Sequence, residues 1–382
     1  MQPGTTIFEH MSGLARQHGA INLGQGFPDF GWSEDVLAAG ARAITTGYNQ
    51  YPPMRGLPEL RGAVAAFYGR RQGLSLSADQ VIITSGATEA VAASIMAVAG
   101  AGDEVVVFTP AYDAYVPLIR RAGAAPVFVE LQPPDWQASA AAIAAAITPA
   151  TRAIILNSPH NPTGAMAGSA MLAAIADLAR AHDLTIISDE VWEEVLTGTV
   201  PHVSVFTLAP ERTIKIGSAG KLLALTGWKV GWVVADAALA ERAAQVHQFL
   251  TFTTAPPLQV AVAAGLALPD AWFAASRCRL AAARDRLAAA LCGAGWFLLQ
   301  THGSYFVMAD LAASGVVLGD REFCDMAVAR AGVAAIPLSA FCPDGRNTGI
   351  IRLCFAKSDA MLDEGAARLN AARVSDWATG AG

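Results

Sequence analysis

Three lysines without an acidic neighbour mark the most reactive stretch of this sequence. Between Thr213 and Ala235 the chain carries Lys215, Lys221 and Lys229 but no Asp or Glu, in the company of leucines and tryptophans. An amine among such residues loses hydration, so it must be neutral, pair with a distant anion or take part in chemistry. A desolvated neutral amine is a nucleophile that can form a Schiff base with an aldehyde.

Further polar groups follow short apolar runs that are typical of buried strands. In open parallel sheets, ligands bind beyond the carboxyl ends of the strands. The predicted ends carry Ser85-Gly86-Ala87-Thr88, Pro110-Ala111-Tyr112, NSPHNPTG at 157–164, Asp189, and Ser218 to Lys221. Because these ends share one edge of a sheet, we expect them to face one ligand.

The stretch SGATEA, directly after VIIT, is typical of an anion site at the start of a helix. The N–H groups of Gly86, Ala87 and Thr88, with the Thr88 hydroxyl, would hold a phosphate. An ordinary helix cap has the same short pattern. Asp189 ends a buried strand and needs a cation or several donors to stay ionised, unless it caps the next helix. Tyr112 can stack on a flat ring or belong to the core or an interface.

The sequence matches neither of two common nucleotide-binding motifs. GSAGKLL lacks the first glycine of a phosphate loop, and Leu222 stands where that motif needs Ser or Thr. The GxGxxG fingerprint of NAD or FAD sites does not occur in the sequence. A lysine for an aldehyde, a lysine and a serine for a phosphate, and an aspartate for a pyridine nitrogen together describe a site for pyridoxal phosphate (PLP).

The elements that must position these groups follow an α/β pattern between about Val81 and Asp236. The runs VIITS, EVVVFTP, APVFVEL, RAIILNSP, TIISDEV, TIKIGS and GWVVAD predict strands, and 89–99 and 169–182 predict helices between them. Strands that are apolar throughout are buried on both faces. We therefore expect a mostly parallel sheet flanked by helices.

A second, smaller α+β domain is predicted after Pro269, where the alternation of short strands and alanine-rich helices gives way to a longer, charged helix. A long helix at 274–295 precedes strand-like runs at 303–310 and 349–356. We expect the N-terminal segment to join this small domain. The expected division is 1–40 for that segment, 41–272 for the large PLP-binding domain and 273–382 for the small domain.

Composition favours a soluble protein that acts on small molecules. Of 382 residues, 53% are hydrophobic, which is enough for a large core. The net charge is −6 and the basic residues are scattered, so the sequence offers no basic patch of the kind that binds nucleic acid. The uncharged stretch from Ala243 to Pro269 contains glutamines and a Pro-Pro pair, which disfavours a membrane span. The start of the sequence shows no secretory pattern, so we expect a cytoplasmic location.

The cysteines predict neither disulfides nor a zinc site. The five of them form no CxxC pair, and we expect reduced thiols in the core and no metal ion. They are Cys278, Cys292, Cys324, Cys342 and Cys354.

Taken together, the motifs resemble those of class I/II aminotransferases of PLP fold type I, and the similarity runs over nearly the whole chain. The stretches that carry it are INLGQGFPDF, NQYPPMRG, SGATEA, TPAYDAY, NSPHNPTG, SDEVW, GSAGKLLALTGWKVGW and GIIRLCFAKSD, in that order. GTTIFEHMSGLARQHGAINLGQGFPDF, HQFLTFTTAPPLQ and AAIPLSAFC are most similar to the branch of methionine and kynurenine aminotransferases (glutamine transaminase K), especially its methionine-type members.

The resemblance implies roles for residues around the cofactor ring. Lys221 would form the Schiff base and carry the proton. Asp189 would pair with the pyridinium nitrogen, Asn161 would bond the ring hydroxyl and Tyr112 would stack on the ring. The residues implied around the phosphate are Gly86, Ala87, Thr88, Ser218 and Lys229, with Tyr51 reaching in from a second subunit of a homodimer.

The substrate carboxylate would bind Arg352, with Asn161 and the backbone near Gly26 beside it. These roles account for Lys221 and Lys229 among the three lysines. The remaining one, Lys215, is expected to be a solvated strand lysine.

One residue departs from the family pattern. Trp192 stands where the family usually has a tyrosine, three residues after the aspartate, and an indole N–H can donate but cannot accept or ionise. We keep Trp192 as a contact of the cofactor. Thr253 matches the position of a specificity histidine of the kynurenine branch, which favours the methionine-like interpretation.

The predicted function is an aminotransferase with ping-pong kinetics. An amino group would pass from an L-amino acid, methionine-like, aromatic or glutamine, to a 2-oxo acid by Schiff-base chemistry. Two alternatives stay open. A C–S lyase acting on sulfur amino acids can use the same groups, and a non-catalytic PLP-sensing module would be expected to carry a DNA-binding segment, which does not precede Met11.

Overall fold

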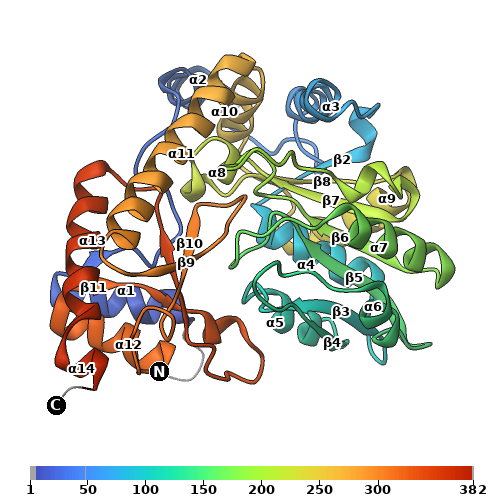
Figure 1. The fold of residues 1–382 in the computed structure, drawn as a ribbon. Coiled ribbons are helices and arrows are strands. Elements are labelled where there is room, and N and C mark those ends of the chain that lie inside the picture. Colours follow the sequence, from blue (N-terminus) through green and yellow to red (C-terminus); the bar gives the residue numbers. More distant parts are fainter. Residues whose placement is uncertain (1–5, 48, 381–382) are drawn as a thin grey trace.

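The largest element of the fold is a seven-stranded sheet. The computed structural model describes residues 6–47 and 49–380, and Figure 1 shows this sheet on the right. Its strand order is β2-β8-β7-β6-β5-β3-β4, and β8 runs antiparallel to both of its neighbours while the other pairs are parallel. The predicted mostly parallel sheet is confirmed.

The seven predicted apolar runs all form strands of this sheet, and most of their residues are buried. Branched side chains on both faces of these strands pack against covering helices, as expected for a parallel sheet. The strands are β2 (Val81–Thr84), β3 (Glu104–Thr109), β4 (Ala125–Glu130), β5 (Thr151–Asn157), β6 (Thr185–Asp189), β7 (Thr213–Ser218) and β8 (Gly231–Val234).

Helices connect and cover these strands, as α4, α5, α6 and α7 show on the sheet in Figure 1. The predicted helix at 89–99 begins earlier, at Ala87, because Gly86 with φ +80° makes the turn out of β2. The helices are α4 (Ala87–Val98), α5 (Tyr115–Arg121), α6 (Ala140–Ala145), α7 (Ser169–Ala181), α8 (Ala219–Leu222) and α9 (Ala237–Leu250).

A four-stranded antiparallel sheet with the order β12-β13-β10-β9 forms the second unit, on the left of Figure 1. The helix predicted at 274–295 is α11, which begins at Asp270. The elements are β9 (Phe297–Leu299), β10 (Phe306–Asp310), β12 (Ile336–Pro337), β13 (Ile350–Cys354), α11 (Asp270–Cys292), α12 (Asp320–Met326), α13 (Asp359–Arg373) and α14 (Asp376–Thr379).

The start of the described chain packs against this second unit. In Figure 1 the blue helix α1 (Ile7–His18) lies among orange and red elements, and β1 (Ile21–Asn22) pairs in parallel with β11 (Val333–Ala334). The residue limits of the three segments stay predictions, and their outer ends at 1–5 and 381–382 lie outside the described residues.

Three more helices are α2 (Glu34–Thr46), α3 (Pro58–Gln72) and α10 (Pro256–Leu266). The helix α10 packs against both α2 and α3, and α3 also contacts β2 of the large sheet. None of the helices described is by itself long and apolar enough to cross a membrane. The neighbours α10 and α11 meet that criterion only as a pair, bent by 91°.

The expectation that all cysteines lie in the core is wrong for two of them. Cys324, Cys342 and Cys354 are buried, but Cys278 and Cys292 are exposed on α11. The core-facing stripe of this helix consists of Phe273, Leu280, Ala283, Leu287 and Leu291, and neither exposed cysteine falls on it.

Candidate active site

One cavity beyond the carboxyl ends of β5, β6 and β7 gathers most of the predicted site. The parallel register places Asn157 beside Asp189. The Asn157 side chain donates to the Asp189 carbonyl at 2.8 Å and accepts from the Asn161 N–H at 2.8 Å, which holds Asn161 at the cavity. The predicted residues that line it are Gly86, Ala87, Thr88, Tyr112, Asn161, Asp189, Trp192, Ser218, Lys221 and Lys229.

Asp189 is a buried carboxylate that forms no ion pair with the residues that the structure describes. Its Oδ2 accepts from the Tyr115 hydroxyl at 2.6 Å, and its Oδ1 lies 3.4 Å from the Val191 N–H. Burial raises the pKa of Asp189 to about 6, against the opposing effect of the Tyr115 hydrogen bond. A cationic ring nitrogen placed beside this carboxylate would stabilise its ionised form.

Lys221 follows β7 in the short helix α8, and its amine is held among aromatic rings. Nζ lies 3.1 Å from the Tyr305 hydroxyl and 4.7 Å from the centre of the Trp192 ring. Burial lowers the pKa of Lys221 to about 8, and the nearby charges of Arg352 and Lys229 act in the same direction. A considerable fraction of this amine is therefore neutral near pH 7 to 8 and available as a nucleophile.

Close backbone approach at the start of α4 makes a cradle for an anion. A Cβ on Gly86 would lie 3.2 Å from Lys229 Nζ, so this glycine lets the lysine reach the helix N-terminus. A Cβ on Gly231 would lie 2.7 Å from the Gly86 carbonyl carbon and 2.8 Å from the Ala87 nitrogen. Free N–H groups at a helix start and an ammonium group suit a phosphate.

Arg352 lies on β13 and is almost completely buried, which makes it a receptor for an anion. Its Nη1 donates to Asn161 Oδ1 at 2.7 Å and its Nη2 to the Gly24 carbonyl at 3.2 Å, while Nε has no partner among residues 6–47 and 49–380. Burial lowers the pKa of Arg352 to about 9. A carboxylate would offset that desolvation by a charge-assisted pair. Gly26 packs on the Phe306 ring, where a Cβ would lie 2.6 Å from Cζ.

Four positions singled out in the sequence do not line this cavity. Arg352 adjoins it through its hydrogen bond to Asn161, and Gly26 accepts a hydrogen bond from Tyr305, whereas Tyr51 and Thr253 lie elsewhere. Tyr51 is 79% exposed, with its ring edge-on to Phe252 at 5.5 Å between centroids. Thr253 lies in the loop between α9 and α10, next to Phe252. The chain therefore does not bring Tyr51 into its own cavity.

The expectation that Lys215 is solvated is wrong. Its side chain is fully buried, and its ammonium donates to Glu190 and, at 2.7 Å, to Glu193. Burial would favour neutral Lys215, but the two carboxylates outweigh it and raise its pKa. Burial likewise opposes ionisation of Glu190, yet Lys215 and His202 hold its pKa down at about 2.

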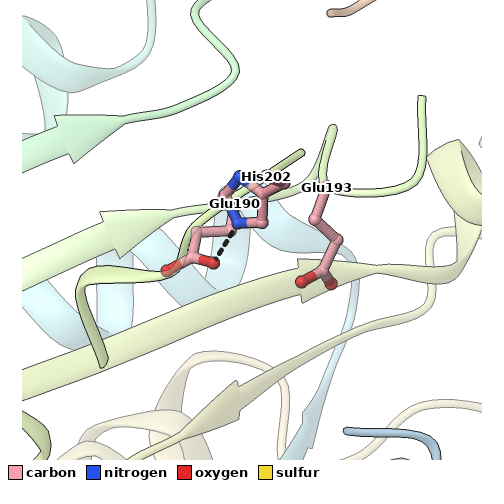
Figure 2. Close-up of side chains that lie close together, drawn as sticks. All are labelled: Glu190, Glu193 and His202. Atoms are coloured by element: carbon pink, nitrogen blue, oxygen red, sulfur yellow. Dashed lines mark hydrogen bonds and ion pairs between the residues drawn. The ribbon is translucent and has the colours of Figure 1, made fainter. Parts of the chain in front are cut away.

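Figure 2 shows Glu190, Glu193 and His202 side by side. His202 Nε2 donates a hydrogen bond to Glu190 at 2.6 Å. Their ligand atoms lie within 4.8 Å of one another, a spacing that a metal ion could bridge. Lys215 already bonds both carboxylates, so the positive charge of this cluster comes from a side chain. The cluster anchors the turn that carries Trp192.

Sequence reasoning missed Tyr115 and Tyr305 as parts of the site. Asn157, which ends β5, was included only within the strand-end stretch NSPHNPTG and was given no role of its own. Tyr115 stands three residues after Tyr112, at the start of α5, and has no local signal for a contact with Asp189. Tyr305 comes from the second unit, next to β10.

A buried lysine beside an anion cradle and an aspartate, at the carboxyl edge of a helix-covered α/β sheet, defines an enzyme of PLP fold type I. The chain belongs to the family "Aminotransferase class I and II", whose model matches residues 18–369. The "Probable N-succinyldiaminopimelate aminotransferase" of Mycobacterium tuberculosis is 42% identical over 96% of each chain, and the "Methionine aminotransferase" of Escherichia coli is 41% identical over 96% of each. Solved structures under these two names, from the same organisms, match with a TM-score of 0.93 each, at 42% and 40% identity over 97% of each chain.

The protein is thus a PLP-dependent aminotransferase, and its residues fit the cofactor. Glycine at 86 and 231 leaves room for a phosphate beside Lys229. Asp189 is a buried carboxylate that a cation would stabilise in its ionised form, and Lys221 is a buried amine with a lowered pKa. Each of these features suits one part of PLP, its phosphate, its pyridine nitrogen and its aldehyde.

Proposed function

We propose that this aminotransferase takes the amino group from an apolar, methionine-like L-amino acid and passes it to a 2-oxo acid. The observation that carries the proposal is the aromatic setting of Arg352. Its guanidinium carbon lies 3.7 Å from the centre of the Phe306 ring, 5.0 Å from that of Phe341 and 5.2 Å from that of Phe8. A carboxylate held by Arg352 is bordered by apolar surface, which favours an apolar donor side chain.

Lys221 and Asp189 are the proposed catalytic residues. When bound, PLP supplies an aldehyde carbon for the amino group and a ring that accepts negative charge. Asp189 would hold the protonated ring nitrogen, and Lys221 Nζ would accept and carry the proton that leaves the donor Cα. Asn161, Tyr112 and Trp192 are proposed to border the ring. The proposed phosphate contacts are Gly86, Ala87, Thr88, Ser218 and Lys229.

Arg352 is proposed to orient the donor, assisted by Asn161 and the backbone near Gly26. The guanidinium fork matches a carboxylate in two parallel hydrogen bonds, which holds the Cα–H bond in one direction. The names of two relatives suggest two different amino donors, methionine for one and N-succinyldiaminopimelate for the other. The rings around Arg352 favour the methionine-like donor.

We further propose a homodimer in which Tyr51 of one subunit completes the site of the other. An apolar surface around Tyr51 supports this proposal. It comprises Tyr51 and Phe252, whose rings are in contact, with Phe249 and Leu250 just before Phe252 at the end of α9, and Phe249 is 86% exposed. Exposed aromatic and aliphatic groups in one area mark interaction surfaces. Sedimentation of the purified protein tests it, and a monomer at catalytic concentrations contradicts it.

A cytoplasmic location is proposed as well. The five cysteines of the chain are free thiols, two of them exposed. Such thiols suit a reducing compartment. Fractionation of the cells that produce the protein would test this.

The experiment for the proposed function is a visible absorption spectrum of the PLP-loaded protein before and after L-methionine, without an acceptor acid. We expect methionine to convert the bound cofactor to its amino form, and N-succinyldiaminopimelate to do so much less. The reverse order of the two donors contradicts the apolar-donor proposal. Release of ammonia without an acceptor would instead identify a C–S lyase. Lys221→Ala is the control variant and should show no conversion.

A further inference from the structure

The Tyr305 hydroxyl bridges Lys221 and the N-terminal segment. It lies 3.1 Å from Lys221 Nζ and 3.2 Å from the carbonyl oxygen of Gly26. A carbonyl can only accept, so the phenol proton must point to Gly26. The oxygen lone pairs then face Lys221, and the hydrogen bond between the two side chains runs from the amine to the phenol.

The ring of Tyr305 is fixed by its neighbours, so the hydroxyl has little freedom to move. Tyr305 is 1% exposed and packs edge-on against Trp192, with ring centroids 4.4 Å apart at 87°. It also contacts the Phe306 ring edge-on at 5.3 Å. Burial raises the pKa of Tyr305 well above its usual value, which keeps the phenol neutral.

The Tyr305 hydroxyl offers Lys221 a hydrogen-bond acceptor that the neighbouring Trp192 cannot offer. Trp192 lines the cavity, and an indole offers no hydrogen-bond acceptor. In the part of the chain that the structure describes, Tyr305 is the phenol that forms a hydrogen bond with Lys221. It reaches Lys221 from the second unit of the fold, because it precedes β10, whereas Lys221 follows β7 of the large sheet.

We propose that Tyr305 is a positioning residue for Lys221, whose hydroxyl accepts a hydrogen bond from the amine and ties its direction to the placement of Gly26. The inference rests on the proposed role of Lys221 as the lysine that binds PLP. The contact links the large sheet, the second unit and the N-terminal segment at a single atom. A shift of Gly26 would therefore move the Tyr305 hydroxyl and change the direction of the Lys221 amine.

The proposal predicts a change in the pKa of Lys221 itself. A protonated amine donates a stronger hydrogen bond than a neutral one, so an acceptor at this point raises the lysine pKa. Tyr305→Phe removes the acceptor and keeps the ring against Trp192. The other charged or titratable groups that affect Lys221 stay in place, and they are Asp189, Lys229, Arg352 and Cys354.

The test is the rate of PLP uptake by the cofactor-free protein as a function of pH, followed by the visible absorbance of the bound cofactor. The wild-type rate should rise with pH through an inflection near 8, where Lys221 loses its proton. In Tyr305→Phe we expect this inflection to move down by about half a unit to one unit. With PLP and an α-deuterated donor, kcat should fall roughly 5-fold and the isotope effect should increase.

Tyr68→Phe is the matched control, because it also removes a buried phenol hydroxyl but one bonded to Glu193 at 2.7 Å. It should lower thermal stability and leave the inflection and the isotope effect unchanged. A well-folded Tyr305→Phe with the wild-type inflection and isotope effect overturns the proposal. If Lys221→Ala takes up PLP with the wild-type pH dependence, the proposed role of Lys221 fails instead, and the two failures are thereby distinguished.

Discussion

The Tyr115 hydroxyl donates a 2.6 Å hydrogen bond to Oδ2 of Asp189, and both side chains are buried. This bond favours the ionised carboxylate, whereas burial favours the protonated one and raises the Asp189 pKa to about 6. The charge of Asp189 therefore depends on Tyr115, which stands at the start of α5. That dependence can be measured through the affinity for PLP.

Tyr115→Phe should make PLP binding more sensitive to acid. Without the hydroxyl, the pKa of Asp189 rises above its present value of about 6. A protonated Asp189 cannot hold a pyridinium, so affinity should begin to fall at a pH about one unit higher than in the wild type. Fluorescence titration of the cofactor-free protein with PLP over a pH series measures this. Tyr68→Phe serves as the control, and coincident curves for the wild type and Tyr115→Phe would contradict the expectation.

Arg352→Lys should impair the amino donor and spare the cofactor. Lysine keeps a positive charge but cannot form two parallel hydrogen bonds with a carboxylate. We expect kcat/KM for methionine to fall about 100-fold, because a buried charged pair is lost in part. The affinity for PLP should stay near the wild-type value. Arg286→Lys, which alters an exposed ion pair with Asp363, is the control, and equal losses in both variants would refute the role of Arg352.

Gly231→Ala should weaken PLP binding through the anion cradle. The added Cβ would lie 2.7 Å from the Gly86 carbonyl carbon, and backbone atoms cannot move aside as a flexible side chain can. We expect the Kd for PLP to increase at least about 10-fold, because the displaced N–H groups meet the phosphate less well. Gly227→Ala is a matched control, since a Cβ there meets nothing within 4 Å. Similar affinities of the two variants would argue against a phosphate at this place.

Local patterns were sufficient to predict the large sheet and most of the cavity. Runs such as TIIS and TIKIG can be buried on both faces only in a helix-covered sheet, and parallel pairing brings their ends together. Asp189 and Lys221 follow directly from that geometry, because Asp189 ends β6 and Lys221 lies in α8, which directly follows β7. The cradle at Gly86 also has a local signature.

Contacts that depend on tertiary structure left no local signal. Tyr115 lies 74 residues before Asp189, and Tyr305 lies 84 residues after Lys221. Lys215 was mispredicted for the same reason, since its carboxylate partners stand 25 and 22 residues away. Only the register of β6 and β7, which pairs Ser188 with Lys215, brings the lysine to these acids.

Lys215→Met should destabilise the fold, because it leaves Glu190 and Glu193 buried without their cation. Removing one partner of a buried ion pair typically costs about 3–5 kcal/mol of the free energy of unfolding. Urea denaturation of the cofactor-free protein at neutral pH measures this loss. In the double variant Lys215→Met/Glu193→Gln one uncompensated charge is gone, so part of the loss should be recovered. No recovery would mean that packing rather than charge dominates at Lys215.

The pH dependence of stability should also differ between these proteins. In the wild type the Glu190 pKa is held at about 2, below its unfolded value of about 4.3, so its contribution is present above that value and lost as pH falls toward 2. The raised pKa of Lys215 adds stability that is present below about 10.4 and lost at higher pH. In Lys215→Met the buried Glu190 carboxylate should bind a proton more readily in the folded state than in the unfolded one, so that moderate acidification stabilises the variant. A variant that loses stability in parallel with the wild type between neutral and mildly acidic pH would show that Lys215 does not control the ionisation of Glu190.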